Sequence, residues 1–268
     1  MPARYPERIV CLTEETTETL YLLGEERRIV GISGYTVRPP RARKEKPRVS
    51  AFLSAKNEKI LELKPDLVLG FSDLQAEIAR DLAKAGLNVV LFNQRSVNEI
   101  LSMILTLSAM VGAADRGAAL IGRLENNLDE VRQRAKAFPR RPRVYFEEWD
   151  EPMISAIRWV SELVEIAGGE DVFQELSFSQ AATGRVIPDG KLVVERRPEV
   201  IFGSWCGKKY RPERVAARPG WQAIPAVRNH ELHEVKSAEI LQPGPAALTD
   251  GVRRLQAVLE EFFSRKGA

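Results

Sequence analysis

The sequence predicts an α/β fold of two Rossmann-like lobes, each with a central and mainly parallel sheet, bridged by one long helix. Residues 57–70, NEKILELKPDLVLG, return in altered form at residues 190–203, GKLVVERRPEVIFG. In each copy a short helix stops at a proline, and an acidic residue leads into an apolar run typical of a buried parallel strand. Residues 115–137 carry one amphipathic pattern, which as a single helix spans roughly 35 Å. A duplicated unit of this kind predicts a ligand cleft between the two lobes.

The first lobe alternates strands with helices, which indicates βαβ units and a parallel sheet. The expected strands are residues 8–12, 28–32, 67–70 and 88–92, and the expected helices are residues 16–23, 58–63 and 74–85. Gly24 closes the first of these helices. Ser96 followed by Glu99 forms the capping pattern that opens a further helix, through residue 111.

The linking helix and the second lobe follow. Pro139 and Pro142 end the 115–137 helix, and a strand at residues 143–146 begins the second lobe. A helix at 160–167 closed by two glycines, the repeated unit, a strand at 231–235 and a terminal helix at 248–263 complete it. We therefore expect an N-terminal lobe at residues 1–112, a linking helix at 113–138 and a C-terminal lobe at 139–268.

Composition places the chain among ordinary globular proteins. It is 44% hydrophobic and 29% charged, with a net charge of +3 from 40 basic and 37 acidic side chains. The basic clusters at 38–48 and 132–143 flank prolines and lack interleaved aromatics, so no nucleic-acid partner is expected. The N-terminal residues include no apolar stretch long enough for a membrane span, so no membrane insertion is expected. The sequence shows no signal peptide, and Cys11 and Cys206 form no CxxC motif. These features predict a cytoplasmic monomer, or a periplasmic protein if an upstream signal was omitted.

Several motifs, in this order, resemble those of the cobalamin- and iron-siderophore-binding proteins of ABC importers. They are residues 34–40, GYTVRPP, residues 57–70, the single long helix, and residues 162–173, ELVEIAGGEDVF. The similarity runs from about residue 7 to residue 263. The chain is most similar to the cobalamin-binding branch, in which an aromatic residue and a Pro-Pro pair precede a short strand and a second aromatic residue at the cleft. The matching residues are Tyr35, Pro39, Pro40 and Phe52.

The resemblance implies a non-catalytic solute-binding protein that holds a corrinoid or a related metal chelate, with no intrinsic cofactor. Its alternatives are an iron-siderophore or haem-binding component of an ABC importer, or a cytoplasmic enzyme or sensor that reuses the fold. Family members carry one exposed Glu on each lobe that pairs with permease arginines. Glu58 matches the first, but Lys191 stands at the second position. One contact then becomes repulsive, at a cost of about 1 kcal/mol, which argues against productive docking on a permease.

The strand-end rule gives the residues expected to line the cleft. From the first lobe they are Thr13, Glu14, Tyr35, Phe52, Phe71, Ser72 and Asn93, and from the second Glu148, Trp149, Trp205, Cys206 and Ser237. Aromatic residues at strand ends suit a large, flat ligand such as a corrin. The alternative for Phe52 and Phe71 is that they close the lobe core. Trp205 has small neighbours, so exposure to the cleft and burial are both open.

An acidic segment surrounds Trp149. Glu147, Glu148, Asp150 and Glu151 follow a strand directly and are expected either to grip a cation or a ligand's amides, or to supply a general acid. The alternative is alternation along a strand end into a solvated loop. Glu148 and Trp149 are the residues selected as functional.

Other chemistry has weaker support. His230 and His233, three apart in a strand-like segment, face opposite sides, so no metal site is expected. The alternative is that one of them is an axial ligand of a corrinoid cobalt or a haem iron. An enzyme that uses the acidic segment with Cys206 as nucleophile is the competing class. However, no nucleophile elbow surrounds Cys206, and a small buried thiol is the simpler interpretation. No nucleotide-binding glycine motif is present.

Overall fold

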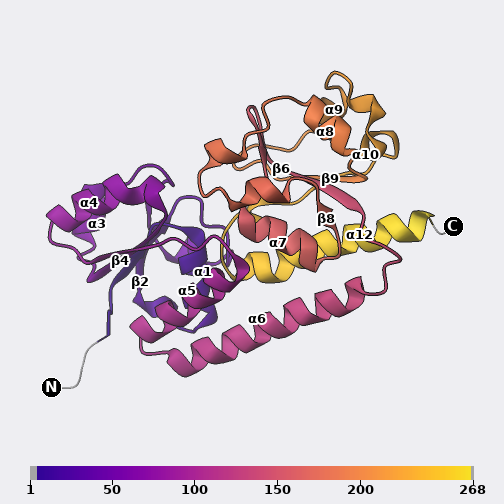
Figure 1. Ribbon diagram of the computed structural model, residues 1–268. Helices are drawn as coiled ribbons and strands as arrows, with labels where there is room; N and C mark the ends of the chain where they lie inside the picture. The colour runs from indigo at the N-terminus through magenta and orange to yellow at the C-terminus, as the bar shows by residue number, and fades with distance from the viewer. Residues whose placement is uncertain (1–4, 267–268) are drawn as a thin grey trace. The chain divides into compact units, whose positions relative to one another are not determined.

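The computed structural model describes residues 5–266 and divides into two compact units. Unit 1 comprises Met1–Gln94 and Asn98–Arg123, and unit 2 comprises Arg95–Val97 and Leu124–Ala268. Each unit has its own sheet and covering helices (Figure 1). The predicted α/β class with two mainly parallel sheets is confirmed. The lobe boundaries and the ligand cleft stay predictions.

The sheet of unit 1 is wholly parallel and has the strand order β3-β2-β1-β4-β5. Its strands are β1 (Ile9–Cys11), β2 (Ile29–Ser33), β3 (Arg48–Ser50), β4 (Leu67–Phe71) and β5 (Val89–Phe92). β1 and β4 are buried along their whole length, as expected for central strands. Periodicity did not predict β3, because three residues with one apolar member, Val49, carry no periodic signal. Only the family resemblance implied the short strand before Phe52.

The helices of unit 1 connect these strands. They are α1 (Glu14–Leu22), α2 (Ala42–Glu45), α3 (Asn57–Glu62), α4 (Ala76–Lys84) and α5 (Val97–Met110), with 3-10 turns η1 (Glu26–Arg28) and η2 (Asp73–Gln75). Helix α1 begins two residues before the predicted start, because Thr13 takes the extended N-cap conformation. The long helix α6 (Ala114–Ala135) is continuous, and the division between the units falls within it.

The sheet of unit 2 has the order β10-β9-β6-β7, and β8 pairs with β6. Its strands are β6 (Arg143–Asp150), β7 (Met153–Ser155), β8 (Glu170–Asp171), β9 (Val200–Gly203) and β10 (Leu232–Glu234). β6 continues through the acidic segment and turns back as an antiparallel hairpin with β7. The predicted end of this strand at residue 146 is therefore wrong. Of the acidic residues, only Glu151 lies in the exposed turn that follows the strand. Glu147 instead sits inside the sheet, beside Gly203 of β9 and Ser155 of β7.

The helices of unit 2 are mostly short. They are α7 (Arg158–Ile166), α8 (Lys191–Arg196), α9 (Pro212–Ala216), α10 (Pro225–Arg228), α11 (Ser237–Ile240) and α12 (Val252–Lys266). Four 3-10 or π turns join them: η3 (Gln174–Phe178), η4 (Ala182–Arg185), η5 (Trp221–Ala223) and the π-helical η6 (Ala247–Gly251).

The internal repeat is confirmed in the backbone. Helix α3 leads to β4 as helix α8 leads to β9. In both copies the residue before the proline adopts a left-handed conformation, with φ of 45° at Lys64 and 47° at Arg197. A non-glycine residue in this region is uncommon, so its recurrence at matching positions supports common ancestry of the two segments.

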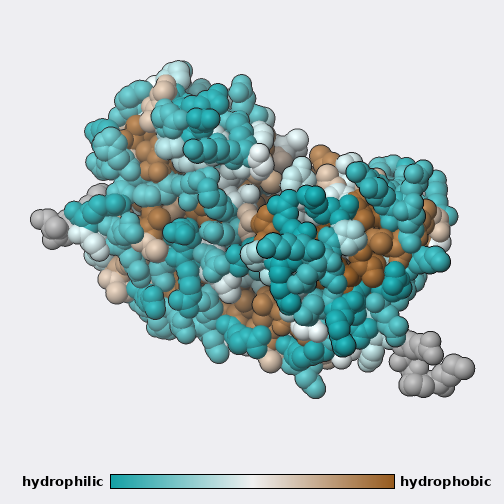
Figure 2. Space-filling model, turned by 180° about the vertical axis from the view of Figure 1, so that it is seen from behind, coloured by the Kyte–Doolittle hydropathy of each residue, from teal (hydrophilic) through white to brown (hydrophobic). Residues whose placement is uncertain are grey.

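Polar and charged side chains cover most of the face seen in Figure 2, with apolar patches between them. None of the helices in the described residues is long and apolar enough to cross a membrane. The apolar residues gather instead in cores on the sheets. One is centred on Val10, Leu12 and Val68 in unit 1, and another on Tyr145, Ile201 and Trp221 in unit 2.

Candidate functional site

The carboxyl edge of the first sheet is the candidate site in unit 1. Because all five strands are parallel, their carboxyl ends meet at one edge. The chain winds outward from β1 through β2 and β3, then resumes at β4 on the other side of β1. Such a reversal leaves a crevice beyond the ends of the two central strands, where ligands of open α/β sheets bind. Tyr35 follows β2, Phe52 follows β3, and Phe71 and Ser72 stand at the end of β4, so the structure brings these four predicted residues to the same edge.

Hydrogen bonds tie the loops of this edge together. The Gln75 side chain donates to the carbonyl of Phe52 at 2.9 Å and accepts from the N–H of Phe71 at 3.0 Å. The N–H of Gly34 donates to the carbonyl of Ser50 at 2.6 Å. The loops after β2, β3 and β4 are thus held as one rim. Gln75 could not be predicted as part of this edge, because an isolated glutamine in a loop carries no pattern.

Exposure separates these side chains. Tyr35, Leu53 and Leu74 expose 54%, 69% and 60% of their surface, and Phe52 is half-buried. Together Tyr35, Phe52, Leu53 and Leu74 form what we call the apolar rim. Exposed apolar side chains gathered at one place mark interaction sites.

Two of the predicted site residues are not part of that surface. Phe71 is 7% exposed and closes the core of the lobe, as the alternative interpretation of this residue predicted. Ser72 is 2% exposed, and its hydroxyl accepts the N–H of Leu74 at 3.3 Å, so it caps the turn η2. Core packing and turn capping thus use these two side chains, and their contact with a ligand stays a prediction.

An acidic group lies at the start of α1, directly after β1. Glu14, Glu15 and Glu18 expose only 7%, 1% and 8% of their surface. Arg38 pairs with Glu18 at 2.8 Å, and the hydroxyl of Thr13 donates to Glu15 at 2.6 Å. Burial, followed by the charges of neighbouring carboxylates, raises the pKa of Glu14 to about 8. Burial raises the pKa of Glu15 to about 7.

Trp205 lies in the core of unit 2. It is 3% exposed and stacks edge-on against Tyr210, with ring centroids 5.0 Å apart. Its indole N–H donates to Glu147 at 3.1 Å. Glu147, fully buried, also accepts two hydrogen bonds from Arg218 and one from Tyr145. The interpretation of Trp205 as an exposed cleft wall is therefore wrong: the small neighbours did not prevent burial, because the partners come from distant segments.

The remaining acidic residues of β6 are already paired. Glu148 forms a two-pronged ion pair with the buried Arg185, and Asp150 pairs with Lys208 at 2.6 Å. The Lys208 ammonium also lies 5.2 Å from the ring centroid of the half-buried Trp149 and 5.1 Å from that of Trp205. The expectation that this segment grips a free cation therefore fails, because protein cations occupy Glu147, Glu148 and Asp150.

Cys206 and Ser237 also lie at the carboxyl ends of strands in unit 2. Cys206 follows β9 and is exposed, so the buried-thiol interpretation is wrong. Ser237 begins helix α11 after β10 and is half-buried. Trp149, Cys206 and Ser237 thus keep accessible surface, but their contact with a ligand stays a prediction.

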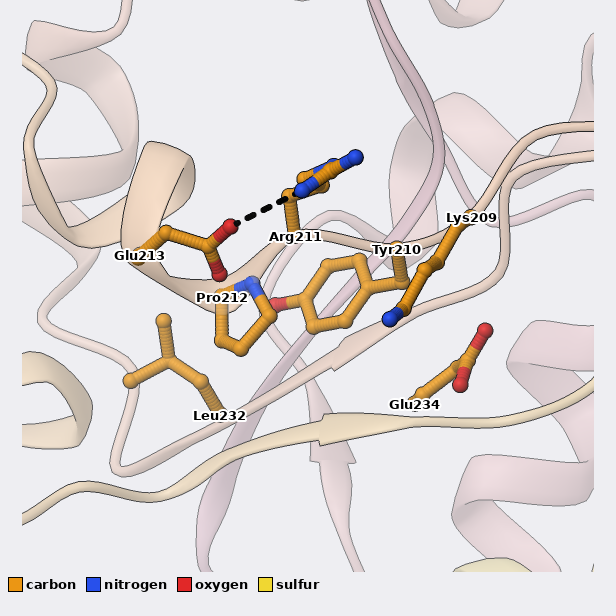
Figure 3. Close-up of a pocket in the computed structure, with 7 residues that line it drawn as sticks. All are labelled: Lys209, Tyr210, Arg211, Pro212, Glu213, Leu232 and Glu234. Carbon is orange, nitrogen blue, oxygen red and sulfur yellow. Dashed lines mark ion pairs between the residues drawn. The ribbon is translucent and has the colours of Figure 1, made fainter.

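A pocket of about 340 Å³ lies beside β10 and is lined by Lys209, Tyr210, Arg211, Pro212, Glu213, Leu232 and Glu234. Figure 3 shows these residues. The Tyr210 ring crosses the middle of the pocket, between Glu213 on one side and Lys209 on the other. Arg211 and Glu213 pair across 3.6 Å. This volume is at the small end for ligand pockets, so the pocket suits a small polar molecule better than a tetrapyrrole.

Metal ligands do not converge in the described residues, where no group of three or more His, Cys, Asp or Glu side chains is placed to hold an ion. His233 lies 2.9 Å from Glu231, which also pairs with Arg265. His230 is exposed.

The two predicted docking residues are both exposed at helix starts. Glu58 lies in the first turn of α3, and Lys191 is the first residue of α8. Their role in docking stays a prediction.

Comparison with known proteins identifies the family. Residues 9–239 match the family model described as periplasmic binding protein. The chain belongs to this family. Members of the periplasmic binding protein family hold solutes, which agrees with the non-catalytic class expected from the sequence.

Individual relatives in the family cover nearly the whole chain. The vitamin B12-binding protein of Vibrio cholerae is 27% identical over 95% of this chain and 89% of its own length. An uncharacterized ABC transporter substrate-binding lipoprotein of Bacillus subtilis, YvrC, is 24% identical over 93% of this chain and 79% of its own. The solved structure of the periplasmic vitamin B12-binding protein BtuF of Vibrio cholerae matches with a TM-score of 0.74 and 25% identity, over 96% of this chain and 98% of that one.

Proposed function

We propose that the protein is a non-catalytic binding protein for a cobalamin-like corrinoid. The observation that carries this proposal is the apolar rim, in which Tyr35, Leu53 and Leu74 are each more than half exposed at the carboxyl edge of the first sheet. A flat macrocycle offers apolar faces to such side chains. Similarity to vitamin B12-binding proteins over almost the whole chain supports the same ligand.

Unit 2 supplies the remaining proposed contacts. Trp149, Cys206 and Ser237 retain accessible surface at the ends of β6 and β9 and after β10. Glu148 contributes through Arg185, whose position it fixes. Phe71, Ser72 and Trp205 support the site from the core instead of contacting the ligand.

The proposed location and partner follow the relatives. The relatives include a lipoprotein and a periplasmic binding protein, so we propose that this protein is periplasmic instead of cytoplasmic. An ABC permease is the corresponding partner. Its docking would use Glu58, with Lys191 as the contact that weakens it.

Replacing Tyr35 with alanine tests the apolar rim. We expect cyanocobalamin affinity to fall by about 1–3 kcal/mol, because a large aromatic contact is lost. Titration calorimetry measures the effect. Tyr5→Ala is the matched control, since Tyr5 is exposed to a similar extent, 51%, but precedes β1 at the opposite edge of the sheet.

The two variants also separate the competing ligands. If Tyr35→Ala and Tyr5→Ala bind cyanocobalamin with equal affinity, the apolar rim does not contact the ligand. Saturable binding of haemin with no binding of cyanocobalamin would replace the corrinoid proposal by the haem alternative.

A further inference from the structure

Glu14 and Glu15 occupy the point where the first sheet reverses its winding. They form the first turn of α1, immediately beyond the carboxyl end of β1 and next to β4. The backbone N–H of Val37 donates to the Glu14 carboxylate. The loop that carries Tyr35 therefore lies against this turn, and the two carboxylates lie beside the apolar rim.

Unpartnered polar atoms collect at this place. Glu14 and Glu15 each have one buried carboxylate oxygen without a hydrogen-bond partner among residues 5–266. Thr36, on the separate loop after β2, is fully buried, and within the same part of the chain its hydroxyl also has no partner. A buried polar atom without a partner costs free energy, and a group supplied from outside the chain offsets that cost.

We infer that Glu14 and Glu15 form the polar floor of the ligand site and select ligands that present amide groups over ligands that present carboxylates. The inference rests on the proposed function and names the ligand class within it. A primary amide carries both N–H donors and a carbonyl acceptor, so it pairs with a carboxyl group in either protonation state. A ligand carboxylate has only acceptors and meets like charge once these two carboxyls are ionised.

The charged side chains around Glu14 and Glu15 leave both carboxyl groups available to hydrogen-bond a ligand. Glu18 faces the same turn but already has Arg38 as its partner. Arg43 is the cation that acts on Glu14, and it is exposed. Burial holds the pKa of both Glu14 and Glu15 near neutrality, so each still exchanges its proton in the physiological range.

Two corrins that both lack the nucleotide loop test this selection. Dicyanocobinamide carries amides on its ring side chains, and dicyanocobyrinic acid carries carboxylates at those positions. In titrations of the full chain at pH 9, where both carboxyls are ionised, we expect dicyanocobinamide to bind at least tenfold more tightly. Glu14→Gln is expected to reduce this preference at least fivefold, because the variant binds dicyanocobyrinic acid more tightly. Glu15→Gln removes the second buried carboxyl and is expected to act in the same direction.

Glu62→Gln is the control, because Glu62 is an exposed carboxylate on α3 of the same unit. Far-ultraviolet circular dichroism checks that each variant is folded. Equal affinity of the unmodified protein for the two corrins would overturn the selection while leaving corrinoid binding intact. If the preference is unchanged in both Glu14→Gln and Glu15→Gln, residues other than Glu14 and Glu15 determine it. If neither corrin binds, the proposed function fails and the inference fails with it.

Discussion

Replacing Arg218 with alanine is expected to lower the free energy of unfolding of unit 2 by about 3–5 kcal/mol. Glu147 is fully buried, and Arg218 is the cation paired with it. Without that cation a carboxylate stays in the core beside Trp205 and Tyr145. The loss should appear in urea unfolding followed by tryptophan fluorescence. All four tryptophans, Trp149, Trp159, Trp205 and Trp221, lie in unit 2, so the signal reports on that unit.

Arg214→Ala is the matched control, since Arg214 lies on α9 nearby and is exposed. We expect this control to change the free energy by less than about 0.5 kcal/mol. The double variant Glu147→Gln with Arg218→Met removes both charges and should recover most of the loss. A loss below about 1 kcal/mol for Arg218→Ala would show that the pair does not stabilise the end of β6 as argued.

The stability of unit 1 is expected to fall as pH rises from 6 to 9. The folded-state pKa values of Glu14 and Glu15, about 8 and about 7, lie above the ordinary value of 4.5. Between these values the folded state binds more protons than the unfolded state. The associated stability is therefore complete below pH 4.5 and is lost as pH rises through 7 and 8. At about 1.4 kcal/mol per pKa unit, the two groups together lose roughly 2–4 kcal/mol over this range.

Hydrogen exchange of the amides of α1 and β1 measures this loss, because unit 1 has no tryptophan. Glu15→Gln should flatten the pH dependence, whereas Glu62→Gln should retain it. The groups that set the result are Glu18 and its partner Arg38, Arg43, and the Thr13 hydroxyl that donates to Glu15. A stability that is constant or rises over this pH range would contradict the buried, proton-binding state of these carboxyls.

Local patterns in the sequence predicted the repeat, the parallel sheets and α6. Proline at 65 and 198 stops a helix wherever the rest of the chain lies, and an uninterrupted amphipathic period defines a helix by itself. The strand-end rule placed Tyr35 and Phe52 at the correct edge, because it depends only on the strand direction.

The failures share a physical cause, which is pairing between distant segments. Glu147 and Arg218 are 71 residues apart, and Glu148 and Arg185 are 37 apart, so the acidic run gave no sign of its partners. The same pairing buried Trp205 and extended β6 into a hairpin. The burial of Glu14 and Glu15 was equally unforeseen, because two carboxylates after a strand are typical of an exposed helix start.

The central claim is that the protein captures a corrinoid without changing it. Equilibrium dialysis of the purified chain against cyanocobalamin, followed by denaturation and mass measurement of the released ligand, tests this most directly. The account predicts saturable binding at one ligand per chain and recovery of intact cyanocobalamin. Absence of saturable binding, or release of a chemically altered corrin, would contradict it.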